Sequence, residues 1–472
     1  MRDAAGATDR PGGHRREDLP LSYAQQGMWF LERLAGTTLY AVPMTFRLAG
    51  ELDTAALHRS IEELVRRHQA LRTRFPVVDG QPVQRVDRDA AVPLPLTDLT
   101  ALAPKEREAE AARFLDEDLG QPFDLAEGPV IRAALIRLAP REHIIRITTH
   151  HMVSDAWSWW SVLFRELERL YTAHVRGLPS PLPPVASHYA DFVRWQRDWL
   201  EGPAYPSQLA YWRKTLEGVS PLPELSLARP AAGRAQEPPV TRWLTFPQPL
   251  YDRLREISRR EHVTLYMLLL TAFKQVLRRY VPGDDILVAT RGGFRSRVEF
   301  ERAVGFFVNV LPLRTRVPET TGFRPLLHDV RRTMIGVYAH RDVPYERLMA
   351  ELGLKRPGFK SVTNVCVSFQ STPEVPPALE GLDVTLINHH DPFSGYDIDL
   401  GFYEEDGALR ALLTHRRAQY DDAAAARLLD DLHRALLAAA HELRPAAADG
   451  PRARPPSPEK RETQGNQEKE DA

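Results

Sequence analysis

Cysteine is almost absent from this sequence, and the signatures of several common protein classes are missing as well. Cys366 is the one cysteine among 472 residues, which excludes an intrachain disulfide, a cysteine-based zinc cluster and an iron–sulfur site. No GxxxxGK[ST] loop and no GxSxG elbow occurs in the chain. The sequence therefore lacks the motifs of P-loop nucleotide binding and of an α/β-hydrolase nucleophile.

Neither sign of charge dominates, and no apolar run is long. Lys plus Arg is 62 and Asp plus Glu is 63, a formal net charge of -1, so no bulk charge draws the chain to nucleic acid or anionic lipid. The longest apolar segment, Met267–Phe273, is too short to span a bilayer. Because Met1–Asp18 is polar and charged, we expect no signal peptide and a cytoplasmic protein without nucleic-acid or membrane partners.

The apolar content supports real hydrophobic cores, and proline punctuation suggests two halves. Apolar residues make up 43% of the chain. Proline-rich stretches at 177–187 and 203–239 interrupt helix formation between the halves, and both ends have too few large apolar residues to pack. We therefore predict a disordered tail, an N-terminal lobe, a C-terminal lobe and a second disordered tail, at residues 1–17, 18–187, 188–443 and 444–472.

Each half alternates helices with strands, which is typical of an α/β fold. In the first half, Asp53 can cap a helix whose apolar residues share one face. In the second half, the pattern predicts a helix over Thr264–Tyr280, followed by the strand DILVAT (285–290). Further strands are expected at 307–317, 363–370 and 396–403, and a final amphipathic helix over Ala423–Leu443.

Residues 143–176 carry the most chemically informative pattern in the chain. Ile144 to His151 is rich in β-branched residues and predicts a strand, on which His150 and His151 point to opposite faces. A helix begins near Ala156, so Asp155 lies where the loop ends. Histidine titrates near neutral pH and suits a general base, and a helix N-terminus favours a developing oxyanion.

Simpler interpretations of the same residues exist. The two histidines can be structural, and Asp155 can be only the N-cap of the following helix. A metal site is disfavoured, because adjacent strand residues face opposite ways and the HExxH spacing is absent.

Seven segments together resemble a known family. HHMVSDA (150–156) resembles the HHxxxDG motif of nonribosomal peptide synthetase condensation domains, which belong to the chloramphenicol acetyltransferase-like superfamily. The other six segments follow in the order of the family: LSYAQQGMWFLERL (21–34), RHQALRTRF (67–75), HYADFVRWQRDWL (188–200), QLAYWRKTL (208–216), VGFFVNVLPLR (304–314) and HRDVPYERL (340–348). The chain departs from the pattern at Ala156, which replaces the motif glycine, at Val310, and around residue 355.

The resemblance implies a fold and a chemistry. The fold is two chloramphenicol-acetyltransferase-like α/β lobes in a V-shaped pseudo-dimer, with the active site between them and a strand that crosses over. The chemistry is transfer of an acyl group from the phosphopantetheine thioester of an acyl or peptidyl carrier protein to an amine or a hydroxyl. Such a reaction requires no metal and no bound cofactor, and we expect a monomer.

The resemblance also implies roles for individual residues. His151 is the expected catalytic residue, which accepts the proton of the nucleophile or stabilises the tetrahedral intermediate, and His150 is structural. Asp155 should point away from substrate and pair with an arginine, for which Arg67 and Arg314 are the candidates. Three further residues have expected places: Asn309 near the tunnel, Trp157 mainly in the core beside the loop, and Cys366 in a buried strand.

These expectations point to a stand-alone condensation enzyme, acting in trans on a free or carrier-bound acceptor. The paired histidines exclude a heterocyclisation domain, and the additional motifs of epimerisation domains were not found. Two alternatives remain open. One is an acyltransferase that uses acyl-coenzyme A or a polyketide or lipid alcohol; the other is a degenerate, non-catalytic module that binds carrier proteins.

Overall fold

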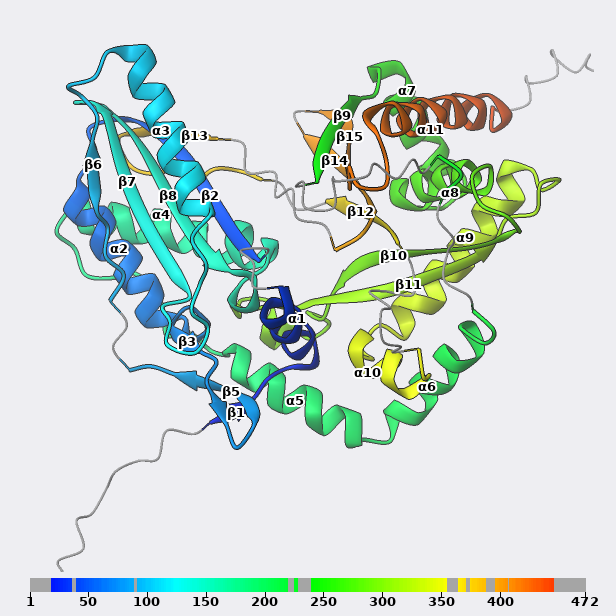
Figure 1. Cartoon of the computed structure of the whole chain (residues 1–472), viewed down its shortest axis with the longest axis horizontal. Coiled ribbons are helices and arrows are strands. Elements are labelled where there is room, and N and C mark those ends of the chain that lie inside the picture. Colours follow the sequence, from blue (N-terminus) through cyan, green and yellow to red (C-terminus); the bar gives the residue numbers. More distant parts are fainter. Residues whose placement is uncertain are drawn as a thin grey trace, which may run out of the picture.

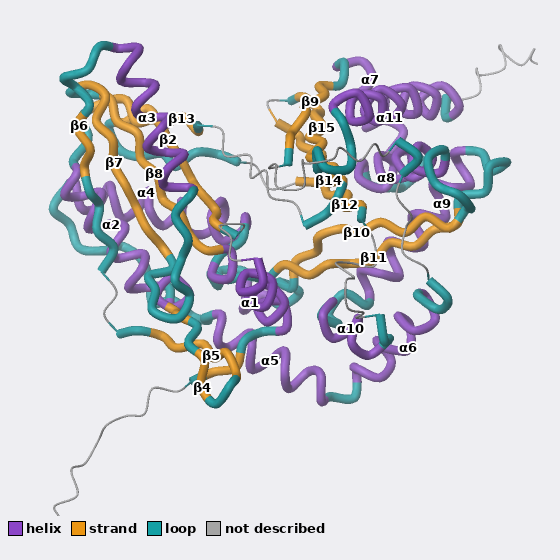
Figure 2. Tube along the Cα trace, in the orientation of Figure 1, coloured by secondary structure: helices purple, strands orange, loops and turns teal. Residues whose placement is uncertain are grey.

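A computed structural model describes residues 18–35, 40–88, 91–219, 225–227, 239–354, 364–370, 374–387, 395–405 and 407–444. Two α/β lobes form a V, with the N-terminal lobe on the left and the C-terminal lobe on the right in Figures 1 and 2. Helix α5 (Tyr189–Glu201) runs along the base of the V. The predicted terminal tails lie outside the described residues, apart from Arg444, as does most of the divergent segment around residue 355.

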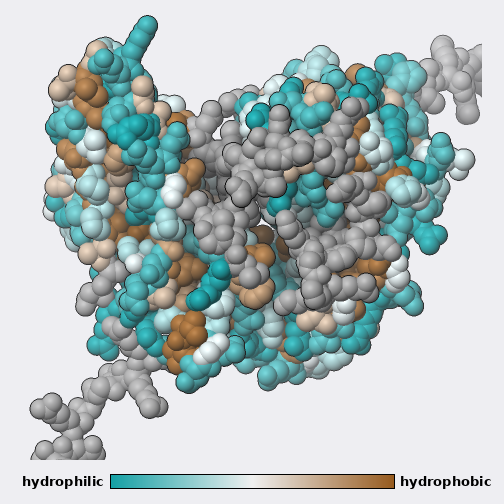
Figure 3. Space-filling model, viewed as in Figure 1, coloured by the Kyte–Doolittle hydropathy of each residue, from teal (hydrophilic) through white to brown (hydrophobic). Residues whose placement is uncertain are grey.

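Hydrophilic residues cover much of the visible face of both lobes, and apolar residues form only small groups there (Figure 3). Within the described ranges, no helix combines the length and the apolar character needed to cross a membrane.

The N-terminal lobe is a mixed sheet with helices on both faces. The sheet has the order β13-β2-β8-β7-β6, and its elements are β2 (Ala41–Gly50), α2 (Thr54–Arg67), β6 (Leu96–Asp98), α3 (Pro104–Leu119), β7 (Ile131–Ala139), β8 (Glu142–His150) and α4 (Phe164–Val175). Alternation along β8 places Ile145 in the core beneath α2 and α4, and Ile144 in the smaller core beneath α3. Asp53 caps α2 as predicted, because its side chain accepts from the Ala56 amide at 2.8 Å.

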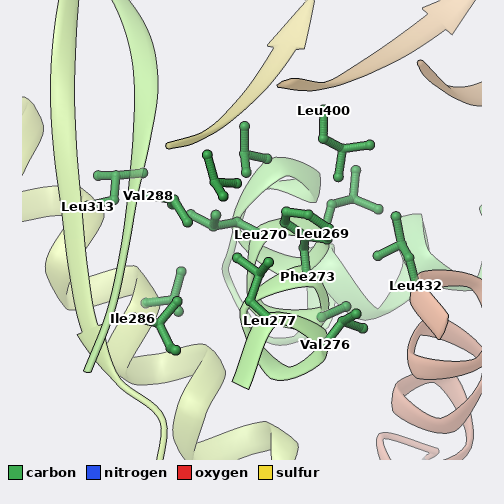
Figure 4. Close-up of a cluster of buried hydrophobic side chains, with 14 of the residues drawn as sticks. Leu269, Leu270, Phe273, Val276, Leu277, Ile286, Val288, Leu313, Leu400 and Leu432 are labelled. Atoms are coloured by element: carbon green, nitrogen blue, oxygen red, sulfur yellow. The ribbon is translucent and has the colours of Figure 1, made fainter. Parts of the chain in front are cut away.

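The C-terminal lobe has a mixed sheet with helices packed on one face. Its order is β11-β10-β12-β14-β15-β9. The elements are β9 (Val240–Thr245), α7 (Gln248–Arg260), α8 (Leu265–Arg278), β10 (Asp285–Gly293), β11 (Val308–Arg316), α9 (Phe323–Ala339), β12 (Val365–Gln370), β14 (Ile398–Glu405), β15 (Ala408–His415) and α11 (Asp422–Glu442). Figure 4 shows the core of this lobe around Leu270 and Phe273 of α8. Val288 of β10, Leu400 of β14 and Leu432 of α11 belong to the same cluster. The predicted helices and strands of this half are confirmed.

Shorter elements complete the base of the V. A small antiparallel sheet is built from β1 (Leu19–Pro20), β3 (Thr73–Arg74), β4 (Val77–Val78) and β5 (Gln81–Val86). Helix α1 (Tyr23–Ala35) lies between the lobes and contacts α10 (Tyr345–Glu351), while α6 (Ala204–Thr215) follows α5.

The two lobes interlock, so the linear boundary predicted at residues 187/188 does not separate their cores. Strand β13 (Leu382–Leu386) comes from the second half of the sequence but pairs with β2 of the N-terminal lobe. Phe192 of α5 and Phe294, Phe300 and Phe307 of the second half also join the N-terminal core. Residues from both halves of the sequence therefore form one hydrophobic core beside the site.

Gly305 packs closely against Tyr189 in this core. A Cβ atom at Gly305 would lie 2.1 Å from Cδ2 of the buried Tyr189, whose hydroxyl donates to the Phe306 carbonyl at 2.7 Å. We expect Gly305→Ala to lower the free energy of unfolding by about 1–3 kcal/mol, because overpacking forces these groups apart. Urea denaturation measures the change. Gly120→Ala, where the nearest atom is 3.4 Å away, is the control, and equal losses in both variants would contradict the prediction.

Candidate active site

His151 stands where β8 ends and the chain turns into a short 3₁₀ segment, His151–Val153. Its Nδ1 lies 2.6 Å from the Ser154 carbonyl oxygen. A carbonyl oxygen only accepts, so Nδ1 carries the proton and Nε2 of the neutral ring carries the lone pair. The Phe306 ring meets the imidazole edge to face at 4.9 Å. Backbone and ring contacts thus fix a histidine whose Nε2 can accept a proton.

The environment favours the neutral form of His151. Burial lowers the pKa of the imidazole below its ordinary value of 6.5, and the charges of His150 and Arg291 act in the same direction. The hydrogen bond to Ser154 and the carboxylate of Asp155 oppose this effect without reversing it. A neutral imidazole near pH 7 is the form that a general base requires.

We therefore expect His151 to titrate below pH 6.5 in the folded protein. The unfolded chain binds the proton more readily, so the stability contributed by the neutral ring is fully present above about pH 6.5 and is lost as the pH falls through the folded-state pKa. The measurement is an NMR titration of the imidazole Hε1 signal, assigned by its absence in His151→Ala. A midpoint at or above 6.5 would show that the environment does not favour the neutral ring.

His150 is buried at the end of β8. Its Nδ1 accepts from the Met152 amide at 3.2 Å, and its ring contacts the aromatic rings of Tyr40 and Phe123. Through the Met152 amide, His150 contacts the backbone of the loop. Among the described residues, no group of three or more His, Cys, Asp or Glu side chains is arranged to hold a metal ion.

Asp155 is buried and receives donors from both lobes. Arg295 donates to its two carboxylate oxygens at 2.6 and 3.0 Å, and the Phe307 amide donates at 3.1 Å. The amide and hydroxyl of Ser158 also donate, at 2.8 and 2.7 Å, so Asp155 is a helix cap as well. Burial alone would raise the pKa of Asp155, but Arg295 and Ser158 lower it below its ordinary value.

The predicted arginine partners of Asp155 are wrong, because both have other carboxylates. Arg67 pairs with Glu166 at 3.1 Å, and Arg314 pairs with Asp285 at the far end of the β10–β11 hairpin at 2.7 Å. Arg295 follows β10 in the segment GGFRSR (292–297). The sequence places Arg295 shortly after a predicted strand, but this position does not reveal its partner. Arg295 and Asp155 are 140 positions apart in the sequence, and only the fold brings them together.

Ala156 and Trp157 form the exposed first turn of the helix that follows. The backbone at Ala156 is helical with a negative φ, so the position does not require the conformational freedom of glycine. Trp157 is 40% exposed, and its indole donates to the Glu301 carbonyl of the C-terminal lobe at 2.8 Å. The expectation of a core tryptophan is therefore wrong at Trp157, although Trp159 and Trp160 are buried.

Asn309 is buried, and both polar atoms of its side chain hydrogen-bond to the backbone. Its amide nitrogen donates to the carbonyls of Arg341 and Val343, both at 2.9 Å, and its amide oxygen accepts from the Tyr345 amide at 3.0 Å. The side chain thereby joins β11 to the segment that leads into α10. Cys366 is fully buried in β12, which raises the pKa of its thiol, as the prediction of a structural cysteine requires.

Comparisons with known sequences agree with this arrangement. The family model of the condensation domain matches residues 15–449. The chain is 37% identical over 433 residues to a component of the linear gramicidin synthase of Brevibacillus parabrevis, covering 89% of this chain and 8% of that protein. It is 36% identical over 361 residues to phosphinothricin tripeptide synthetase PhsC of Streptomyces viridochromogenes, covering 75% and 33%. The chain thus spans a small part of the length of these relatives.

Solved structures share the two-lobed, chloramphenicol acetyltransferase-like fold. The X-domain in its complex with OxyB from teicoplanin biosynthesis is similar with a TM-score of 0.80 at 26% identity, covering 93% of this chain and 97% of that one. The SgcC5 protein from Streptomyces globisporus is similar with a TM-score of 0.72 at 26% identity, covering 90% and 99%. Motif order, sequence matches and fold agree that this chain belongs to the condensation-domain family of nonribosomal peptide synthetases.

Proposed function

We propose that this chain transfers an acyl or aminoacyl group from the thioester of a carrier protein to an amine or hydroxyl acceptor, forming an amide or an ester. The observation that carries the proposal is the fixed orientation of His151, whose Nδ1–H is held by the Ser154 carbonyl while Nε2 keeps its lone pair. Amide-bond formation is the general activity of the family to which the chain belongs.

The proposed reaction is an addition followed by an elimination. The acceptor nitrogen or oxygen attacks the thioester carbonyl, and Nε2 of His151 takes its proton. The tetrahedral intermediate then collapses as the C–S bond breaks, and the leaving carrier thiolate takes up the proton from Nε2 of His151, which returns to its neutral form. A hydroxyl depends on the base more than a free amine does, because a neutral amine is already nucleophilic. Since thioester to amide is downhill, we propose that the chain acts without a bound cofactor.

We also propose that the chain works in trans on a carrier protein. The SgcC5 protein is matched over 99% of its own length, so its chain has this fold almost throughout. Acyl-coenzyme A remains the alternative donor, because it presents the same phosphopantetheine thioester without a protein.

A second candidate function follows from the structural comparison. The X-domain of teicoplanin biosynthesis, with the same fold, is found in a complex with OxyB. A module that recruits a partner enzyme to a carrier protein would use the surface of this fold and would not need His151. The orientation of His151 favours the catalytic function.

The test offers the protein a panel of acyl-loaded carrier proteins and, separately, the matching acyl-coenzyme A thioesters. Each donor is combined with a panel of amines and alcohols, and products are identified by mass spectrometry. Carrier-dependent product supports the proposal. Equal rates from coenzyme A thioesters would identify the alternative donor, and no product from any donor would support the recruitment module.

A further inference from the structure

One face of the C-terminal sheet carries an ion pair and is turned towards the N-terminal lobe. Helices α7, α8, α9 and α11 lie on the outer side of the sheet (Figure 1), and Thr290 of β10 accepts from Tyr266 of α8 on that side at 2.7 Å. Alternation therefore places the next residue, Arg291, on the opposite face. In β14, Leu400 belongs to the helix-covered core, so Asp399 shares the face of Arg291.

Arg291 and Asp399 form an ion pair on this face. The guanidinium donates to both carboxylate oxygens, with Nη1 to Oδ1 at 3.2 Å, across the intervening strand β12. The side chain of Asp399 is 11% exposed, whereas that of Arg291 is 37% exposed. A guanidinium has five N–H donors, and contact through both terminal nitrogens leaves the edge that carries Nε–H for a second planar anion.

The pair lies along the hairpin that leads to His151. Phe306, which contacts the His151 ring, is two residues before Val308, and Val308 pairs with Gly293 and Val310 with Arg291. Along the hairpin, the pair of Gly293 and Val308 lies between Phe306 and Arg291. A Cβ at Gly293 would meet no atom of the described residues closer than 4.0 Å. The positive charge of Arg291 also acts on His151 and contributes to its lowered pKa.

We propose that Arg291, held by Asp399, binds the carboxylate of an amino-acid-type acceptor that is free in solution. This inference rests on the proposed function and names its acceptor class. A carrier-bound amino acid has its carboxyl group in the thioester and presents no carboxylate there, whereas a free amino acid keeps it. The phosphate of a carrier arm lies at the opposite end of that arm from the thioester, and therefore away from an arginine whose charge reaches His151.

The experiment measures kcat/KM for acceptors that differ in one group. The acceptors are glycine, β-alanine, 4-aminobutyrate and 4-aminobenzoate, each compared with its primary amide, with an acyl-loaded carrier as donor. We expect the wild-type protein to favour the acids over the amides by about 10- to 100-fold, as charge-assisted hydrogen bonds do. Arg291→Gln should reduce this ratio to about one, and Arg291→Lys to an intermediate value.

Two further variants keep the result interpretable. Arg291→Gln with Asp399→Asn removes both charges, so no carboxylate is left buried without its cation, and it should show the same loss of preference. Arg410→Gln is the matched control: Arg410 is also 37% exposed and pairs with a carboxylate, Glu405, at 3.1 Å, but it lies on β15. Its acid-to-amide ratio should equal that of the wild type.

The inference is overturned if the wild-type protein uses acids and amides equally, or if Arg291→Gln slows both alike. A protein that forms no product with any acceptor would instead count against the proposed function. In that case, saturation-transfer NMR of the same acids and amides with the protein alone decides the inference. Tighter binding of the acids, lost in Arg291→Gln and kept in Arg410→Gln, would support an anion site, and equal binding of acids and amides would refute it.

Discussion

Replacing His151 with alanine is expected to lower kcat for the condensation reaction by about 10²- to 10⁴-fold, the usual contribution of a positioned acid–base group. The variant loses the Nε2 lone pair that takes the proton of the acceptor. It also loses the Nδ1–H bond to Ser154 that orients the ring. The loss should be larger for a hydroxyl acceptor than for an amine, because a hydroxyl must give up its proton as it attacks.

Single-turnover kinetics with one acyl-loaded carrier and two acceptors, an amine and an alcohol, measure this loss. His58→Ala is the matched control, since His58 also bonds to a backbone carbonyl through a ring nitrogen, at 3.0 Å from the Val92 oxygen, but lies on α2. Wild-type rates in His151→Ala, with the protein still folded, would mean that His151 is not the catalytic base.

Replacing Asp155 with asparagine is expected to cost about 3–5 kcal/mol of unfolding free energy, because it leaves the Arg295 guanidinium buried without its counter-charge. The side chains of Arg295 and Asp155 are only 10% and 4% exposed. The variant also weakens a contact between the two halves of the sequence, since Asp155 accepts from the Phe307 amide. Activity should therefore fall together with stability.

A double-mutant cycle in urea separates the pair from its surroundings. Asp155→Asn combined with Arg295→Gln should recover part of the loss, because no single charge stays buried. The exposed pair of Asp329 and Arg332, with side chains 41% and 73% exposed, is the control, and Asp329→Asn should cost at most about 1 kcal/mol. Two results would contradict this prediction. One is an equal loss of unfolding free energy in Asp155→Asn and Asp329→Asn, and the other is additive losses for Asp155→Asn and Arg295→Gln in the cycle.

The sequence alone predicts the local arrangement of a strand, a loop and a helix around His150 and His151. The predicted strand ends at His150, one residue earlier than expected, and His151 begins a 3₁₀ segment. Asp155 precedes a helix and caps it, as such an acidic residue commonly does. The α/β class and the positions of α8 and α11 follow equally from periodicity over a few turns.

Only the tertiary structure decided which distant groups meet. Arg295 rather than Arg67 or Arg314 reaches Asp155, and β13 joins the sheet of the other lobe. The predicted boundary at residues 187/188 does not separate two hydrophobic cores for the same reason, since large apolar residues from both sides of it fill one core. Ion pairing and burial depend on where the folded backbone brings side chains together, and sequence spacing constrains only the nearest turns of the chain. The motif that contains His151 and Asp155 could therefore be located from the sequence alone. The ion pair between Asp155 and Arg295 depends on the fold.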